Sequence, residues 1–252
     1  VLAIAEAEDF NFAEVDDLGH ITHRDYLPDH VRDVMALELV DKAAIEAKNY
    51  TVAIDCVNSV GGLAIPAILR ELGVKNIIEL NCEPTGHFAH NPEPIPQNLT
   101  QISDLMREGK ADVGFVVDPD VDRLAIICED GEMFGEEYTL VSVADYVLSH
   151  TPGNTVSNMS STRALSDVTV KHGGSYSASA VGEVNVTTEM KRTNAVIGGE
   201  GNGGVIYPAS HYGRDALVGI ALFLSSLAQK GCKVSELRAT FPDYCISKNR
   251  ID

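Results

Sequence analysis

From residue 51 onward, short apolar runs alternate with stretches whose apolar positions recur at helical spacing. The run TVAIDCV at 51–57 predicts a buried strand, GGLAIPAILRELG at 61–73 predicts a helix closed by Gly73, and VKNIIEL at 74–80 predicts a second strand. Such an order predicts a βαβ unit, in which the two strands run parallel. Residues 27–48, which also have helical spacing, predict one amphipathic helix ahead of this unit.

The pattern continues through a Pro-rich surface loop at 83–96 and a helix at 97–109. The run VGFVV at 113–117 then predicts a third strand, and LAIICED at 124–130 predicts a fourth. The segment DPDVDR lies between these two runs, so its acidic residues are expected at the end of a strand.

A second series of the same kind follows a predicted helix from Glu136 to His150 and the turn TPGN. Strands are expected at 154–160, 175–182 and 195–199, with helices at 161–173, 184–193 and 215–231. The fold class is therefore α/β, with two tandem three-layer-type domains and mixed, largely parallel sheets. We expect a linker or tail of another domain at 1–28, one α/β domain at 29–138 and another at 139–252.

Composition narrows the function. A net charge of −18, with no cluster of Lys and Arg, disfavours nucleic acid as a partner. No apolar run approaches the roughly 20 residues that span a bilayer, so no membrane contact is expected. The five cysteines form no C-x-x-C pair, which favours reduced thiols and a cytoplasmic location. The same negative field opposes an anionic substrate, which would need a local metal ion or positive patch.

The segment DPDVDR offers such a metal site. If it is extended, alternate residues face the same way, and Asp118, Asp120 and Asp122 direct three carboxylates at one point. Hard cations with oxygen ligands relieve this repulsion, which argues for Mg²⁺, and Arg123 stands beside it. The alternative is an Asp-rich surface turn that binds nothing.

The segment GGEGNGG, which follows the run AVI, offers a place for a sugar. Its glycines let the backbone approach a ligand closely, while Glu200 and Asn202 present a carboxylate and an amide suited to vicinal hydroxyls. The alternative is a flexible hairpin without a ligand, because a Gly-rich loop alone is weak support for a binding site.

Both segments resemble motifs of one family. VVDPDVDRLAI resembles the D-x-D-x-D-R metal loop of the α-D-phosphohexomutase superfamily, and GGEGNGGVIYP resembles its sugar-specificity loop; IDCVNSVGG, NPEPIPQNL and VGEVNV fit as well. Gly204 replaces the histidine that often ends the sugar loop, as in the archaeal and Bacteroidetes type. As a hypothesis, His211 and Arg214 replace that histidine as ligands for sugar or phosphate. Alternatively, His211 is a loop residue and Arg214 opens the last helix with Asp215.

The resemblance implies the second and third of four domains. Asp118, Asp120 and Asp122 would bind Mg²⁺, and Arg123 would contact the phosphoryl group on the enzyme's serine, which lies in another domain. The implied enzyme is an isomerase, an intramolecular phosphotransferase of the phosphomannomutase/phosphoglucomutase or phosphoglucosamine mutase kind. It acts on hexose phosphates through a phosphoserine and a bisphosphate intermediate, and a chain with these two domains alone would be inactive.

Two other functions stay open at this stage. One is a Mg²⁺-dependent sugar phosphatase with Asp118 as its nucleophile. The other is a non-catalytic module that binds sugar phosphates. The residues do not choose among glucose, mannose and glucosamine phosphates, and they identify neither a general base nor an oligomeric state.

Overall fold

The computed structural model describes residues 1–246 and contains two four-stranded sheets. The first has the order β2-β1-β3-β4 and consists of β1 (Thr51–Asp55), β2 (Asn76–Leu80), β3 (Val113–Val117) and β4 (Leu124–Ile127). Strand β1 pairs in parallel with β2 and β3, whereas β4 is antiparallel to β3. The expected βαβ unit is present, with α4 (Gly61–Glu71) as its crossover helix.

The second sheet repeats this plan. Its order is β6-β5-β7-β8, and its strands are β5 (Asn154–Asn158), β6 (Tyr176–Ser179), β7 (Ala195–Glu200) and β8 (Gly204–Ile206). Strand β5 is parallel to β6 and β7, and β8 is antiparallel to β7. Both acidic and glycine-rich segments therefore occupy the same position in their sheets, at the turn between the third and fourth strands of each series.

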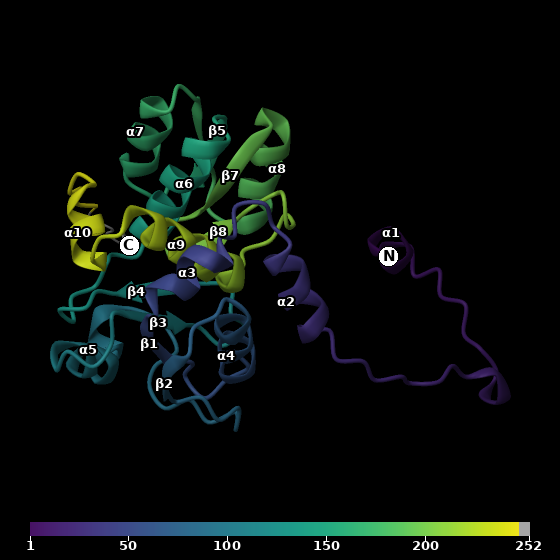
Figure 1. Cartoon of the computed structure of the whole chain (residues 1–252). Helices are drawn as coiled ribbons and strands as arrows, with labels where there is room; N and C mark the ends of the chain where they lie inside the picture. Colours follow the sequence, from purple (N-terminus) through teal and green to yellow (C-terminus); the bar gives the residue numbers. More distant parts are fainter. Residues whose placement is uncertain (247–252) are drawn as a thin grey trace, which may run out of the picture.

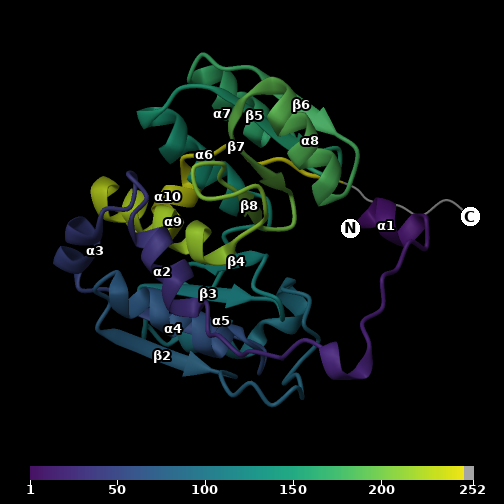
Figure 2. The same cartoon turned by 90° about the vertical axis from the view of Figure 1, so that its right-hand side faces the viewer.

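Helices cover both sheets. They include α2 (Leu27–Met35), α3 (Lys42–Lys48), α5 (Thr100–Arg107), α6 (Tyr138–His150), α7 (Ala164–Lys171), α8 (Glu183–Thr193), α9 (Ala216–Lys230) and α10 (Val234–Ala239). On the outer face of the first sheet, Ile102 and Met106 of α5 are buried, and on the outer face of the second, Val186 and Met190 of α8 are buried. Figure 2 shows the two sheets one above the other, with α9 between them. The predicted α/β class with mixed, largely parallel sheets is confirmed.

The space between the sheets holds one apolar core to which both series contribute. Phe223 of α9 is fully buried, and its ring meets Phe115 of β3 and Phe134 edge-on at 6.1 and 5.4 Å between centroids. Helix α6 packs against α7, α9 and β7, and also contacts β4. The two halves of the chain are therefore joined by a shared core.

The single helix expected over 27–48 is wrong. Helix α2 ends at Met35, and α3 begins only at Lys42, where the Asp41 side chain accepts a hydrogen bond from the Ala44 N–H. Apolar positions before and after the break keep helical spacing, so the sequence pattern does not reveal where one helix ends and the next begins. Strand β8 was not predicted either, because three residues after a glycine-rich turn carry no periodicity.

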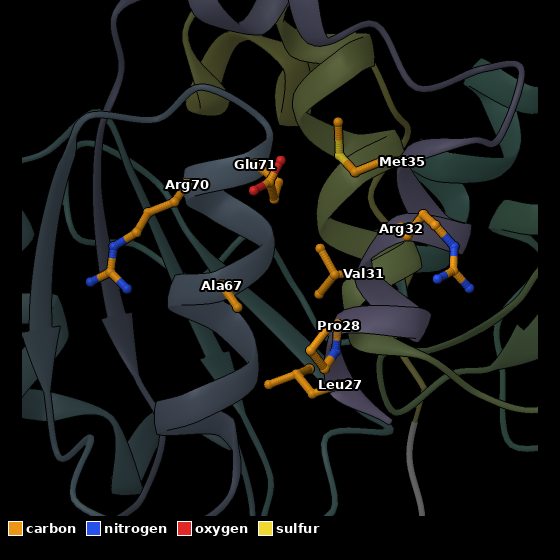
Figure 3. A pocket seen from close by; sticks show the side chains of 8 residues that line it. All are labelled: Leu27, Pro28, Val31, Arg32, Met35, Ala67, Arg70 and Glu71. Atoms are coloured by element: carbon orange, nitrogen blue, oxygen red, sulfur yellow. The ribbon is translucent and has the colours of Figure 1, made fainter. Parts of the chain in front are cut away.

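Helix α2 lies against both α4 and α9. Figure 3 shows Leu27, Val31 and Met35 of α2 beside Ala67 of α4, around a groove of about 560 Å³. Residues 1–26 are exposed and run away from the sheets, with a short helix α1 (Leu2–Glu6) at the start (Figure 1). In the described part of the chain, no helix is long and apolar enough to cross a bilayer.

Candidate metal and sugar site

The acidic loop follows β3 and is a turn, not the extended segment expected. The Val121 N–H donates to the Asp118 carbonyl at 3.1 Å, and Val121 has φ of 63°, a left-handed conformation that β-branched residues rarely adopt. This turn, and not the alternation of an extended chain, brings the three aspartates together. Local strain of this kind is typical of functional loops.

Asp118, Asp120 and Asp122 each offer a carboxylate oxygen, and these oxygens lie within 4.8 Å of one another. Asp118 is buried, Asp120 is exposed and Asp122 is partly buried. Burial and the neighbouring Asp118 carboxylate raise the pKa of Asp122 to about 7, because a second negative charge is unfavourable here. A divalent cation with oxygen ligands would remove this cost, so these residues fit Mg²⁺.

Asp118 also organises its surroundings. Its Oδ1 accepts hydrogen bonds from the N–H groups of Asp122 and Arg123 at 3.2 and 3.1 Å, and its Oδ2 accepts from Arg123 Nε at 2.5 Å. Ser59, after β1, supports the turn because its Oγ donates to the Pro119 carbonyl at 2.6 Å. The Arg123 guanidinium is thus held beside the aspartates. The sequence analysis missed the support from Ser59, because Ser59 lies 60 residues before Pro119 in the sequence.

The glycine-rich loop begins at the end of β7 with Glu200, which is buried. Its Oε1 accepts hydrogen bonds from Asn158 Nδ2 at 2.7 Å and from the Gly182 N–H at 3.3 Å. Asn202 accepts from the Gly204 N–H through its own Oδ1 at 3.2 Å and is partly exposed. The loop is a hydrogen-bonded turn between β7 and β8, and whether it binds a ligand stays a prediction.

The two loops are bonded to each other. The Leu124 N–H donates to the Gly203 carbonyl at 3.1 Å, and Arg123 and Gly204 form an isolated antiparallel bridge. Gly203 has φ of +93°, and a Cβ there would stand 2.4 Å from the Leu124 carbonyl oxygen, so only glycine fits. This contact joins the first strand series to the second at the aspartates.

Arg214 lies between the two loops and is paired with three carboxylates. Its guanidinium contacts Asp122 of the acidic loop, Glu200 at 2.6 Å and Glu183 at the start of α8 at 3.0 Å. The prediction placed Arg214 near a sugar or phosphate, and the structure places it beside both loops. Asn158 was missed because it stands in no recognisable motif, and Glu183 was missed although it lies in the segment VGEVNV, because that segment assigns no role to its carboxylate.

His211 takes a different position. Its Nε2 is 2.9 Å from Asp215 Oδ2, and the same oxygen is 2.8 Å from Nε2 of His30 on α2. Asp215 caps α9 as the alternative reading of this segment expected, since its Oδ1 accepts from the N–H groups of Leu217 and Val218. His211 as a sugar or phosphate ligand stays a prediction.

A cleft of about 430 Å³ adjoins the glycine-rich loop. Gly201 borders it, together with Ser160 and Thr162, which lie between β5 and α7, and Glu137 at the start of α6. The Glu137 carboxylate accepts hydrogen bonds from the Thr162 N–H and hydroxyl at 2.7 and 2.6 Å, which fixes one wall. There is thus open space beside Gly201 of the loop.

Comparison with known proteins matches both halves of the chain. The family model described as "Phosphoglucomutase/phosphomannomutase, alpha/beta/alpha domain II" covers residues 28–131, and that of alpha/beta/alpha domain III covers residues 135–244. The phosphoglucomutase/phosphomannomutase of Thermococcus kodakarensis is 34% identical over 240 residues, which span 94% of this chain and 52% of that protein. The "Probable phosphoglucosamine mutase" of Methanopyrus kandleri is 31% identical over 216 residues, or 85% of this chain and 48% of that protein.

Solved structures agree. A phosphoglucomutase/phosphomannomutase family protein from Burkholderia thailandensis superposes with a TM-score of 0.76 at 28% identity, over 87% of this chain and 47% of that one. The chain spans about half the length of the curated relatives it matches. The sequence motifs, the repeated sheets and these matches together show that the chain belongs to the phosphoglucomutase/phosphomannomutase family of α-D-phosphohexomutases and corresponds to its domains II and III.

Proposed function

We propose that this chain supplies the magnesium-binding and sugar-binding domains of a phosphohexomutase, which moves a phosphoryl group between two hydroxyls of one hexose. The observation that carries the proposal is the bonded pair of loops: three converging aspartates on one and Glu200 on the other, linked through Arg214. A metal and a sugar would then be held side by side. Such transfer depends on positioning and charge stabilisation, which this arrangement offers.

Each residue has a proposed part. Mg²⁺ bound by Asp118, Asp120 and Asp122 would neutralise charge on the transferring phosphoryl group. Arg123, fixed by Asp118, would contact an oxygen of the transferring phosphoryl group. A phosphoserine in another domain would donate that phosphoryl group. Glu200 would accept hydrogen bonds from sugar hydroxyls, and Asn202 would both donate hydrogen bonds to them and accept hydrogen bonds from them.

The phosphatase alternative has less support than the mutase. Both halves of the chain match domains of one mutase family. The hydrogen bonds that Asp118 accepts hold its carboxylate in a fixed position beside Arg123.

The proposed substrates are hexose phosphates of the glucose, mannose or glucosamine kind. A structural neighbour at 16% identity and a TM-score of 0.59, N-acetylphosphoglucosamine mutase of Aspergillus fumigatus, was solved with GlcNAc-6P and magnesium; at this identity the likeness concerns the fold. All five cysteines are free thiols, which fits the proposed cytoplasmic location.

Titration calorimetry on the chain tests the two loops separately. Asp120→Asn removes an exposed ligand and should weaken Mg²⁺ binding about tenfold or more, because one of three charged ligands is lost. Glu200→Gln should weaken binding of a hexose phosphate while leaving Mg²⁺ uptake in place. Asp104→Asn, an exposed aspartate paired with Arg107, is the matched control and should change neither.

Two results would contradict the proposal. One is the absence of Mg²⁺ uptake by the wild-type chain, and the other is Mg²⁺ uptake that Asp120→Asn and Asp104→Asn reduce equally. A chain that binds Mg²⁺ but no glucose, mannose or glucosamine phosphate would retain the metal assignment and remove the sugar assignment.

A further inference from the structure

A second group of potential ligands lies outside the two loops, where α2 meets the start of α9. It consists of His30 on α2, His211 in the segment after β8, and Asp215 at the N-cap of α9. The ligand atoms of these three side chains lie within 4.8 Å of one another. Their chemistry differs from that of the acidic loop, because two of the three donors are imidazole nitrogens.

We infer that His30, His211 and Asp215 form a binding site for a transition-metal ion of the Zn²⁺ class. Two imidazoles and one carboxylate are a typical donor set for zinc, whereas Mg²⁺ prefers oxygen ligands and keeps several waters. The chain would therefore hold two metal sites that differ in selectivity.

Asp215 is already oriented as a ligand. Its Oδ1 accepts hydrogen bonds from Leu217 and Val218 N–H at 2.8 and 3.1 Å, which leaves Oδ2 directed at the two histidines. Although burial opposes the charge, hydrogen bonds from His211 and His30 hold the pKa of Asp215 well below its ordinary range, so the carboxylate is ionised. A ligand whose other oxygen is bonded to the protein backbone has the outer support that metal ligands usually show.

The histidines supply the rest of the site. Both Nε2 atoms already approach Asp215 Oδ2, at 2.8 and 2.9 Å, and ligand atoms around a tetrahedral zinc stand roughly 3.3 Å apart, given metal–ligand distances near 2.0 Å. The two rings would therefore have to move away from Asp215 Oδ2 to admit the ion. The side chains of His30 and His211 are 35% and 43% exposed, so an ion can enter and a water can take the fourth position.

The hydrogen bonds of the two histidines to Asp215 determine which protons must move when a metal ion binds. Each Nε2 now faces a carboxylate oxygen and carries a proton, so metal binding requires that proton to leave Nε2. A neutral imidazole moves it to Nδ1, and an imidazolium releases one proton to solvent.

Zinc here would join two parts of the chain. His30 belongs to α2, which precedes the first sheet in the sequence, whereas His211 and Asp215 follow β8, the last strand of the second sheet. Asp215 also follows Arg214, which contacts both candidate loops. A bound ion would therefore fix α2 against the start of α9, one residue after Arg214.

The test measures Zn²⁺ uptake by the chain in excess Mg²⁺, and records the visible absorption of a Co²⁺ substitute. Wild type should take up zinc at one site, give the bands of tetrahedral Co²⁺, and melt at a higher temperature with zinc than without. His30→Gln and His211→Gln should each weaken uptake about tenfold or more and abolish the zinc-dependent rise in Tm. Asp215 is left unchanged, because its loss would also uncap α9.

A matched control is available in the exposed N-terminal segment. His20→Gln with His23→Gln removes two histidines spaced to bind metal adventitiously, and Cys245→Ser removes an exposed thiol; these variants should retain the high-affinity site. The inference is overturned if wild type shows no tetrahedral Co²⁺ bands, or if the control variants lose uptake as fully as His30→Gln. A lower Tm of His30→Gln that is the same with and without zinc would mean that the cluster only bonds α2 to α9.

Discussion

Arg214 neutralises carboxylates on three separate segments: Asp122 in the acidic loop, Glu200 in the glycine-rich loop and Glu183 on α8. Its guanidinium is paired with Asp122, one of the proposed Mg²⁺ ligands. The positive charges of Arg214 and of a bound Mg²⁺ would repel each other. Arg214→Met should therefore raise the affinity for Mg²⁺ about tenfold, or roughly 1.4 kcal/mol, and weaken hexose phosphate binding because Glu200 loses its partner. Calorimetry with each ligand measures both changes.

The control is Arg163→Met, since Arg163 is 82% exposed and its carboxylate partner is Asp167 of α7, not a residue of the acidic loop. It should alter neither affinity. Weaker Mg²⁺ binding by Arg214→Met would show instead that the arginine holds Asp122 in place for the ion, and equal effects of the two variants would remove Arg214 from the site.

At this scale the sequence predicted that the three aspartates meet, but not the contacts between residues of different segments. Asp118, Asp120 and Asp122 stand close together in the chain, so a single turn suffices to gather them. The pairing of Arg214 with Asp122 depends on two loops from different sheets, and nothing local in the sequence encodes that distance. The same holds for Asp215, whose bond to His30 spans 185 residues.

Among the helices, Asp145 of α6 is a junction. It contacts His172 and Lys171 at the end of α7 at 2.9 and 3.1 Å, and Lys230 at the end of α9 at 2.9 Å. Although burial opposes its charge, the hydrogen bonds from His172 and the lysines lower its pKa from 3.8 to about 2. Three helices are thus tied to one carboxylate.

Asp145→Asn should lower the free energy of unfolding by about 2 kcal/mol at neutral pH. The folded-state pKa lies below the unfolded one, so this contribution is present above about pH 4 and is lost as the pH falls towards 2. Urea unfolding of wild type and variant across this range should show a difference that is constant near neutrality and shrinks in acid. Asp104→Asn, on the surface, should give no such trend, and a gap that widened in acid would contradict the assignment.

The elements themselves were largely predictable, because long apolar periodicity decides them. Two exceptions have physical causes. The break between α2 and α3 depends on the Asp41 side chain capping a new helix, and periodicity does not register a cap. Strand β8 is defined by pairing with β7, a tertiary contact that outweighs weak local preference.

Over the whole molecule, the two strand series share their topology and also one core. Leu124, Ile126 and Phe115 of the first sheet, and Ile197 and Val205 of the second, belong to the same buried cluster. The order of strands was expected to repeat. A common core could not be read from two separate patterns, because α6 and α9 are buried on nearly every side and the sequence does not say which sheet covers them.

Such a core predicts that both halves unfold together. Phe223→Ala removes the ring that Phe115 and Phe134 contact and should cost about 3 to 5 kcal/mol. Amide hydrogen exchange in β1 and in β5 should accelerate by the same factor, although Phe223 follows the second sheet in sequence.

Met190→Ala, in the separate cluster under α8, is the comparison: if the halves are coupled, it too accelerates exchange in β1. Exchange in β1 that Met190→Ala leaves unchanged would mean that the outer layer of the second sheet opens independently, and unchanged exchange in β1 after Phe223→Ala would show two independent domains.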